Sequence, residues 1–333
     1  MWDDLFETTQ GIELVVGVGT PIEPGPVIKP PAPWYIFQTL TDFDDRGDVR
    51  DELNPDDDVG YQGFDNASDY IEAGRGDDKV FGNGLGDTLH GMEGDDELDG
   101  GDGNDVVTGG IGDDEIWGRD GQDSLFGGLG QDHIRGGADD DTIWGDRDAG
   151  PSSGQPPVRK FGDGAADTLE GDSGNDRMFG EGGDDAIFGG SDDDFLVGGF
   201  GDDRIRGGSD DDVIRGGLGD DILTGDGANS STAQQSHSGG ADTFVYASEE
   251  IRPGRTTEHW GADIITDFEV GLDHFDFSGH RMVDSIDDLT ITVFENATQI
   301  AYGDGGYGGL STILVQDVGS ATGTALTSDD FIF

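Results

Sequence analysis

The chain has 333 residues, enough for two or three domains, and carries 74 acidic residues against 17 basic ones, a net charge of −57. This charge excludes nucleic acid as a partner, because nucleic-acid binding needs a basic surface, and self-repulsion favours a soluble monomer. The absence of cysteine excludes disulfides and thiolate metal sites. No run of about 18 apolar residues occurs, so the sequence predicts no transmembrane segment.

Residues 1–60 precede the repeats and are predicted to form an irregular, proline-rich leader. Ile12–Val18 could form one strand, and the six prolines of Pro21–Pro33 favour an extended, stiff segment. Trp34–Phe37 is a short apolar cluster that could cover the first repeat. The alternative is a poorly ordered leader with one docked segment.

Residues 61–228 are dominated by one nine-residue repeat. An aspartate recurs every ninth residue from Asp69 to Asp141 and again from Asp167 to Asp221, which gives sixteen units. In the unit Gly109–Trp117, the first six residues are predicted to form a turn, where glycine permits positive φ. The last three residues are predicted to form a short strand, in which alternation directs Ile116 inward and its neighbours outward.

The position two residues after each aspartate is therefore the predicted core of this region. It is aliphatic or Met in every unit: Ile71, Val80, Leu89, Leu98, Val107, Ile116, Leu125, Ile134, Ile143, Leu169, Met178, Ile187, Leu196, Ile205, Ile214 and Leu223. Each unit buries one such side chain but must order nine residues, and the carboxylates repel one another. We therefore expect the array to be unfolded until a cation neutralises the acid.

Rows of carboxylates on glycine-rich turns suit hard divalent cations, above all calcium. The units GGDGNDVVT, GGIGDDEIW, GGLGQDHIR, GGFGDDRIR and GGLGDDILT follow the pattern GGxGxD plus an aliphatic residue. This pattern resembles the RTX (repeats-in-toxin, haemolysin-type) calcium-binding nonapeptide.

The resemblance implies an all-β fold, a calcium-loaded parallel β-roll of nonapeptide repeats capped by a C-terminal β domain. Two units make one turn, units n and n+2 stack, and up to about a dozen Ca²⁺ ions lie between turns, held by loop carbonyls and aspartates. The implied metal ligands are Asp78, Asp87, Asp96, Asp105, Asp114, Asp123, Asp132, Asp141, Asp167, Asp176, Asp185, Asp194, Asp203, Asp212 and Asp221. The first unit, around Asp69, is degenerate and is left out of this set.

Some units depart from the pattern. The second glycine is replaced by Asn83, Met92, Arg119, Asp163, Asp172 and Glu181, and the fourth-position glycine by Asp139, Asp192 and Asp210. A further acid fills the fifth position at Asp77, Asp95, Asp113, Asp140, Asp184, Asp202 and Asp220. We expect these fifth-position carboxylates to face solvent and not to bind the ion directly.

Two interruptions and a terminal region complete the chain. Residues 146–161 and Asp226–Ser238 are interpreted as loops that leave the array. Residues 229–333 are predicted to form a C-terminal β cap and type I secretion domain, because repeat arrays need capping. Within it, Asp263–Phe268, Leu289–Phe294 and Ser311–Val315 have the alternation typical of antiparallel strands, and residues 303–309 that of a turn.

The terminal region carries a second resemblance. Gly240–Tyr246 and Gly261–Ser278 are similar to the terminal domain of serralysin-type proteases and related type I secreted proteins, and Asp330–Phe333 to their C-terminal export motif. The resemblance implies the type I secretion machinery as a partner and an extracellular location, where millimolar calcium would fold the chain. The N-terminus lacks the basic region of a signal peptide.

No catalytic motif is present. The six histidines form no HExxH zinc motif, and no GxSxG elbow occurs. His90 and His133 fall at outward strand positions and are expected to be exposed. Phe126 and Trp144 on one face, with Trp117 on the other, could form a sugar-binding surface, although packing beneath the first loop is favoured.

The sequence therefore predicts a secreted calcium-binding RTX protein that is not an enzyme and has a structural or interaction role. The alternative is the RTX and secretion portion of an exported enzyme, of alginate epimerase or protease type, that lacks its catalytic domain. Met1 and the leader favour the first interpretation. A third is an enzyme within the C-terminal β domain.

Overall fold

In the computed structural model of the chain, side chains are described for residues 68–146, 164–226, 240–246, 261–280, 283–294, 297–302, 311–316 and 326–333. The backbone alone is described for 37–39, 48–50, 60–62, 303 and 310. All of these residues belong to the unit Tyr35–Phe333. The predicted elements Ile12–Val18 and Pro21–Pro33, the 304–309 part of the predicted turn and the interior of both loops lie outside the described residues.

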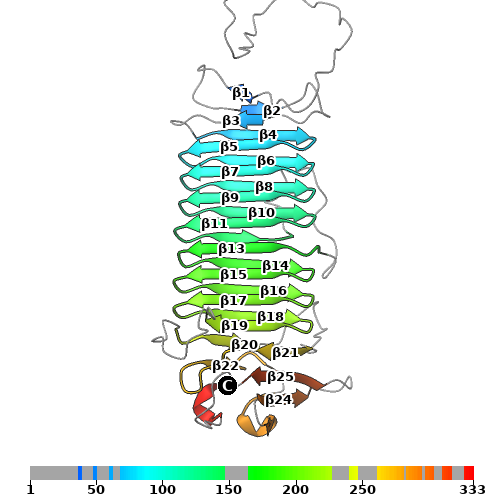
Figure 1. Ribbon diagram of the computed structural model, residues 1–333, viewed down its shortest axis with the longest axis vertical. Helices are drawn as coiled ribbons and strands as arrows, with labels where there is room; N and C mark the ends of the chain where they lie inside the picture. Colours follow the sequence, from blue (N-terminus) through cyan, green and yellow to red (C-terminus); the bar gives the residue numbers. More distant parts are fainter. Residues whose placement is uncertain are drawn as a thin grey trace, which may run out of the picture. The chain divides into compact units, whose positions relative to one another are not determined.

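Successive repeats alternate between two sheets (Figure 1). Sheet A contains β5 (Lys79–Gly84), β7 (Glu97–Asp102), β9 (Glu115–Asp120), β11 (His133–Ala138), β13 (Thr168–Ser173), β15 (Ala186–Ser191), β17 (Arg204–Ser209) and β19 (Ile222–Asp226). Sheet B contains β4 (Tyr70–Arg75), β6 (Thr88–Glu93), β8 (Val106–Ile111), β10 (Ser124–Leu129), β12 (Thr142–Trp144), β14 (Arg177–Gly182), β16 (Phe195–Phe200) and β18 (Val213–Leu218). All strand pairs within these two sets are parallel. The predicted parallel β-roll is confirmed.

The register shows that units n and n+2 stack. Leu125 of β10 lies opposite Val107 of β8 on one side and opposite Ile143 of β12 on the other. Equivalent residues of alternate repeats are therefore neighbours, as the resemblance implied.

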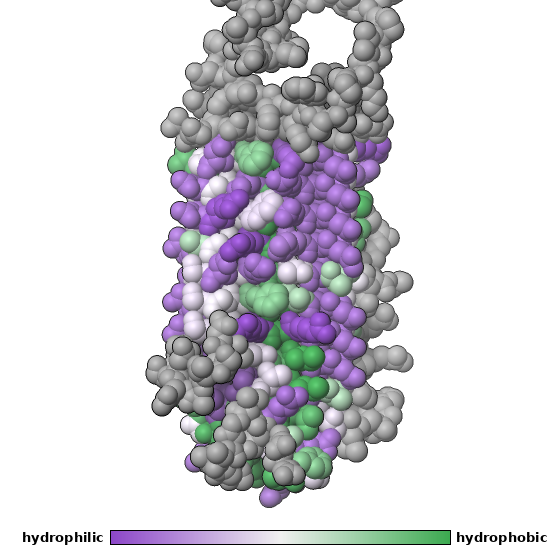
Figure 2. All heavy atoms as spheres, in the orientation of Figure 1, coloured by the Kyte–Doolittle hydropathy of each residue, from purple (hydrophilic) through white to green (hydrophobic). Residues whose placement is uncertain are grey.

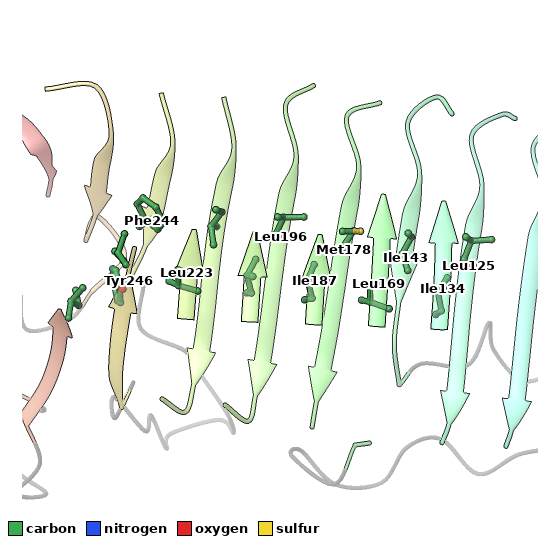
Figure 3. Packing of buried hydrophobic residues seen from close by; sticks show 14 of the residues in the cluster. Leu125, Ile134, Ile143, Leu169, Met178, Ile187, Leu196, Leu223, Phe244 and Tyr246 are labelled. Carbon is green, nitrogen blue, oxygen red and sulfur yellow. The ribbon is translucent and has the colours of Figure 1, made fainter. Parts of the chain in front are cut away.

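The core is a file of aliphatic side chains between the two sheets (Figure 3). Each of the sixteen predicted inward residues is at most 2% exposed. Phe244, Ile265 and Phe275 continue this core beyond the last predicted repeat.

The turns require positive φ at the second and fourth positions of the repeat. The residues that replace glycine at these positions also adopt it. Asn83, Met92, Arg119, Asp172 and Glu181 at the second position, and Asp139, Asp192 and Asp210 at the fourth, all have φ between 74° and 92°. Leu85, at φ 71°, is a further fourth-position replacement that the sequence pattern did not reveal. Asp163 lies outside the described residues.

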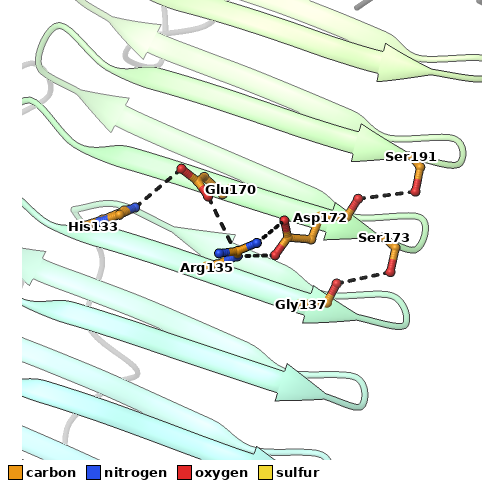
Figure 4. Close-up of polar contacts among 7 residues, drawn as sticks. All are labelled: His133, Arg135, Gly137, Glu170, Asp172, Ser173 and Ser191. Carbon is orange, nitrogen blue, oxygen red and sulfur yellow. Dashed lines mark hydrogen bonds and ion pairs between the residues drawn. The ribbon is translucent and has the colours of Figure 1, made fainter.

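The outer faces of the sheets carry ladders of side chains. On sheet A, Arg135 forms ion pairs with Asp172 and Glu170, and Glu170 also contacts His133 (Figure 4). On sheet B, the rings of Phe126 and Trp144 stack with centroids 4.6 Å apart, one turn apart on one face as predicted. Figure 2 shows rows of hydrophilic side chains repeating from turn to turn along the described roll.

The leader contributes strands where an irregular segment was expected. β1 (Phe37–Thr39) and β3 (Gly60–Gln62) extend sheet A, and β2 (Asp48–Arg50) extends sheet B, all in parallel register. The described part of the leader thus contains short strands that continue the two sheets, and the extent of the leader stays a prediction.

The expectation of antiparallel strands in the terminal region is only partly confirmed. β23 (Thr290–Val293), β24 (Ala297–Gly303) and β25 (Leu310–Gln316) form an antiparallel unit. The expectation is wrong for Asp263–Phe268, because β21 (Ala262–Ile265) is parallel to both β19 and β25. β20 (Thr243–Val245), β22 (His274–Asp276) and β26 (Phe331–Ile332) likewise continue sheet B in parallel.

Two short 3₁₀ turns, η1 (Ile286–Asp288) and η2 (Ser328–Asp330), complete the described elements. Within the described ranges, no helix has the length and apolar character needed to cross a bilayer. The domain boundary placed at residue 228 stays a prediction, and both parallel sheets run across it.

Two described residues, Asp146 and Gly164, flank the first interruption. Asp146 accepts hydrogen bonds from the N–H groups of Ala165 at 3.1 Å and Gly182 at 3.0 Å. Asp146 and Gly164 thus lie in register with the next turn on either side of the predicted loop, whose bounds at 146–161 stay a prediction.

Candidate metal centre

The repeat aspartates form two hydrogen-bonded rows, one along each line of turns. Asp96 Oδ1 accepts the N–H of Asp78 at 2.8 Å, and Asp114 Oδ1 accepts the N–H of Asp96 at 2.9 Å. Each carboxylate thereby anchors the turn before it, and each aspartate is at most 3% exposed. We call these the aspartate rows.

The two rows collect every predicted metal-ligand aspartate. One row runs through Asp78, Asp96, Asp114, Asp132, Asp167, Asp185, Asp203, Asp221 and Asp263. The other runs through Asp69, Asp87, Asp105, Asp123, Asp141, Asp176, Asp194, Asp212, Asp242 and Asp273.

The predicted ligand set left out four members of these rows. Asp69 was set aside as degenerate, and Asp242, Asp263 and Asp273 lie where the nine-residue spacing is lost. The signal that could have found them is the recurrence of Asp two residues before Phe244, Ile265 and Phe275, which fill the core position.

The second carboxylate oxygen behaves differently from the first. Among the described residues, Oδ2 is buried and has no hydrogen-bond partner in Asp87, Asp96, Asp105, Asp114, Asp123, Asp132, Asp141, Asp167, Asp176, Asp185, Asp194, Asp203, Asp212, Asp221 and Asp242. A buried carboxylate oxygen without a partner is costly, so a whole row of them indicates a missing positive partner.

The first-position glycines form a cradle around this oxygen. A Cβ on Gly91 would overlap both Asp96 Oδ2 and the carbonyl oxygen of Gly109 one turn later. Gly127, with Asp132 Oδ2 and the Gly145 carbonyl, repeats the arrangement. A carboxylate oxygen and a main-chain carbonyl oxygen therefore both lie beside the first-position glycine, in space that the Cβ of any other residue would fill.

This donor set fits calcium. Calcium takes carboxylate and backbone carbonyl oxygens at flexible geometry. Within the described ranges, no three acidic or histidine side chains converge on one point. A cation at the cradle would therefore draw on backbone carbonyls in addition to the aspartates.

Electrostatics support a cation at these positions. Burial raises the pKa of Asp114 to about 8 and that of Asp203 to about 9, and neighbouring carboxylates add to both rises, whereas a backbone N–H opposes them. The pKa of Asp87 rises to about 7 for the same leading reason. Without a cation, the ionised rows are therefore destabilising at neutral pH.

The fifth-position acids form a separate, exposed set of hydrogen bonds. Asp77 Oδ1 accepts the N–H of Asp95 at 3.0 Å, and Asp95 Oδ1 accepts the N–H of Asp113 at 2.9 Å. These bonds run in the opposite direction to those of the buried rows. Solvent exposure of these residues is confirmed, and their role in tying adjacent turns was missed.

The two strand histidines differ from each other. His133 is exposed, as expected. The expectation is wrong for His90, which is only 7% exposed and packs edge-on against Tyr70 with ring centroids 5.4 Å apart. Burial lowers the pKa of His90.

A parallel β-roll with buried carboxylate rows and glycine cradles defines a metal-binding repeat protein. The sequence profile of the RTX calcium-binding nonapeptide repeat matches residues 65–84, 81–116, 117–150, 161–196 and 197–231. These residues are RTX calcium-binding nonapeptide repeats. No curated protein matches the chain.

Two solved structures are similar to it. One is a subunit from the Azotobacter vinelandii mannuronan C5-epimerase, with 22% identity over 53% of this chain and 82% of that one, at a TM-score of 0.29. The other is an extracellular lipase from Serratia marcescens, with 16% identity over 83% of this chain and 42% of that one, at a TM-score of 0.24. At these TM-scores neither similarity bears on the function of this chain.

Proposed function

We propose that this chain is a secreted calcium-binding protein whose roll folds when Ca²⁺ binds after type I export, and that the folded roll has a structural or interaction role. The observation that carries the proposal is the row of buried, unpartnered Oδ2 atoms beside glycine cradles. The repeat aspartates from Asp78 to Asp221 are the proposed ligands.

The residues act as follows. Oδ1 of each aspartate orients the carboxylate by accepting an N–H from the preceding turn, and this aims Oδ2 at the first-position glycine. Calcium supplies the positive charge and the oxygen coordination that this arrangement lacks. Neutralising the rows removes the repulsion that opposes stacking, so binding and folding become one step.

The position of the C-terminal motif supports export before folding. Asp330 is fully buried and accepts the N–H of Gly271 at 2.7 Å, and Phe331 is 7% exposed in a strand paired with β22. A receptor for these residues needs the unfolded chain. Low calcium in the cytosol would keep the motif accessible, and high calcium outside would bury its first two residues, while Ile332 and Phe333 stay 40% exposed.

We assign the roll no catalytic role, because its buried carboxylates are accounted for by cation binding. The test is a titration of calcium into EDTA-treated protein followed by far-UV circular dichroism, with magnesium as the control. A steep coil-to-β transition with calcium alone is expected. A folded roll in EDTA, or an equal transition with magnesium, overturns the proposal.

A further inference from the structure

The last turn of the roll differs from the others at one glycine. In the preceding turn of sheet A, the cradle of Gly207 is lined by Asp212 Oδ2 and by the carbonyl oxygen of Gly225. The cradle of Gly225 is lined in the same way by Asp242 Oδ2. The next strand of sheet A has no glycine at the equivalent position. Its register with β19 places Asp267 opposite Gly225.

The register is fixed by contacts on both sides of this pair. Leu223 lies opposite Ile265, and the hydroxyls of Thr224 and Thr266 are 2.8 Å apart. One residue further on, the N–H of Gly225 donates to Asp267 Oδ1 at 2.9 Å. A carboxylate thus takes the place of the main-chain acceptor used in regular turns.

Two buried carboxylate oxygens flank Gly225 as a result. Asp242 is 1% exposed, and its Oδ2 has no hydrogen-bond partner, although its Oδ1 accepts the N–H of Asp212 at 3.0 Å. Asp267 Oδ2 is also buried without a partner. Asp242 comes from the roll and Asp267 from the segment after β21.

Asp273, the last member of the row that contains Asp242, differs from this pair. Asp273 uses both oxygens, which accept the N–H groups of Asp242 at 3.1 Å and Glu269 at 2.7 Å. Both oxygens of the Asp273 carboxylate therefore accept a backbone N–H, whereas only Oδ1 does so in Asp242 and in Asp267. Burial raises the pKa of Asp242 to about 8, and the charges of Asp273, Asp226 and Asp267 add to the rise.

We propose that Asp242 and Asp267, two residues outside the matched nonapeptides, form a further divalent-cation site beside Gly225, which joins the end of the roll to the C-terminal cap. Hard oxygen donors and two carboxylates on one cation make calcium the fitting ion. Each regular cradle offers one unpartnered carboxylate oxygen, so this site has the higher ligand charge. It binds more tightly than a regular site and orders the cap.

This inference rests on calcium binding by the roll, and its test separates the two claims. The number of calcium ions bound per chain is measured by equilibrium dialysis with radioactive calcium on the full chain and on Asp242→Asn, Asp267→Asn and the double variant. Asp276→Asn is the matched control, because this cap carboxylate accepts the N–H of Ser278 outside both rows. Circular dichroism checks that each calcium-loaded variant keeps its β-roll.

Each single variant should lose one tightly bound ion, and the double variant should lose that same ion and no other. The control should lose none. If Asp267→Asn keeps the full number, or if the double variant loses two ions, the shared site is wrong while calcium binding by the roll stands. If the unaltered chain binds no calcium, the proposed function itself fails.

Discussion

The N–H of Asp132 donates to Oδ1 of Asp167 at 2.8 Å, although 35 residues separate them in sequence. Asp114 and Asp132, the preceding pair of the same row, are 18 residues apart, so the interruption inserts 35 − 18 = 17 residues without breaking the row. Asp141 and Asp176 show the same 35-residue step in the other row at 2.7 Å. The roll is therefore continuous across the two repeat blocks.

Joining Asp146 directly to Gly164 should leave the roll intact. Removing the 17 residues from 147 to 163 restores the nine-residue spacing between Asp141 and Asp167. Because loop closure entropy varies slowly with loop length, the free energy of unfolding should change by less than about 1 kcal/mol. Calcium titration by circular dichroism checks this, and loss of the calcium-induced transition would show that the removed residues are required.

Buried and exposed aspartates should respond differently to the same substitution. Asp132→Asn keeps an Oδ1 acceptor for Asp114 but replaces the Oδ2 charge in the cradle of Gly127. We expect calcium affinity at that site to fall on the order of tenfold or more. Asp113→Asn alters an exposed carboxylate of the adjacent turn, which accepts the N–H of Gln131, and should leave the number of bound ions unchanged. Isothermal titration calorimetry distinguishes the two, and equal effects would contradict the assignment of roles.

The glycine cradle should not tolerate a methyl group. Gly91→Ala places a Cβ against Asp96 Oδ2 and the Gly109 carbonyl oxygen. We expect the free energy of unfolding to fall by about 1–3 kcal/mol and the ion beside Gly91 to be lost. The control is Gly271→Ala, where a Cβ would meet no atom within 4 Å. Only the positive φ of 84° disfavours alanine there, and the expected loss in the free energy of unfolding is about 1 kcal/mol.

Equilibrium unfolding in saturating calcium, combined with ion counting, separates these two glycine variants. Gly271→Ala should keep every ion. Retention of every ion by Gly91→Ala would mean that the cradle is not part of the site.

Acid should partly replace calcium in folding the roll. The folded-state pKa values of Asp203 and Asp212 rise to about 9, and that of Asp87 to about 7, from 3.8, chiefly because of burial. A group whose pKa is raised on folding favours the folded state at low pH, and this stability is lost as pH rises through the folded value. In EDTA, β content should therefore increase as pH falls from about 9 towards 5.

With calcium present the pH dependence should reverse, because protons compete with the ion for the carboxylates. Circular dichroism across this range in EDTA and in calcium measures both. A metal-free chain whose spectrum is independent of pH would show that the aspartate rows are not buried in the absence of metal.

The part of the fold that follows from the repeat could be predicted from sequence. Ile116 and Trp117 fall on opposite faces because alternation is a local property, and the turn departures at Asn83 and Met92 are recognised because each replaces a glycine of positive φ. Leu85 escaped this reasoning because Gly84 and Gly86 on either side made the unit look regular.

What could not be predicted depends on contacts distant in sequence. The hydrogen-bond partners of Asp242 and Asp263 are such contacts, because interruptions whose length the repeat does not set separate them from Asp212 and Asp221. The parallel pairing of β21 with β19 and β25 is likewise set by the existing ladder and not by its own alternation. Local patterns carry no information on such partners.

The most direct test of calcium binding by the aspartate rows is a crystal structure of the calcium-loaded chain with anomalous scattering data. We expect a line of calcium peaks along both aspartate rows. Each peak should lie beside an aspartate Oδ2 and a glycine carbonyl oxygen of the next turn, such as Asp96 Oδ2 and the Gly109 carbonyl. Peaks confined to the exposed fifth-position carboxylates, or Oδ2 atoms bonded only to water, would contradict this expectation.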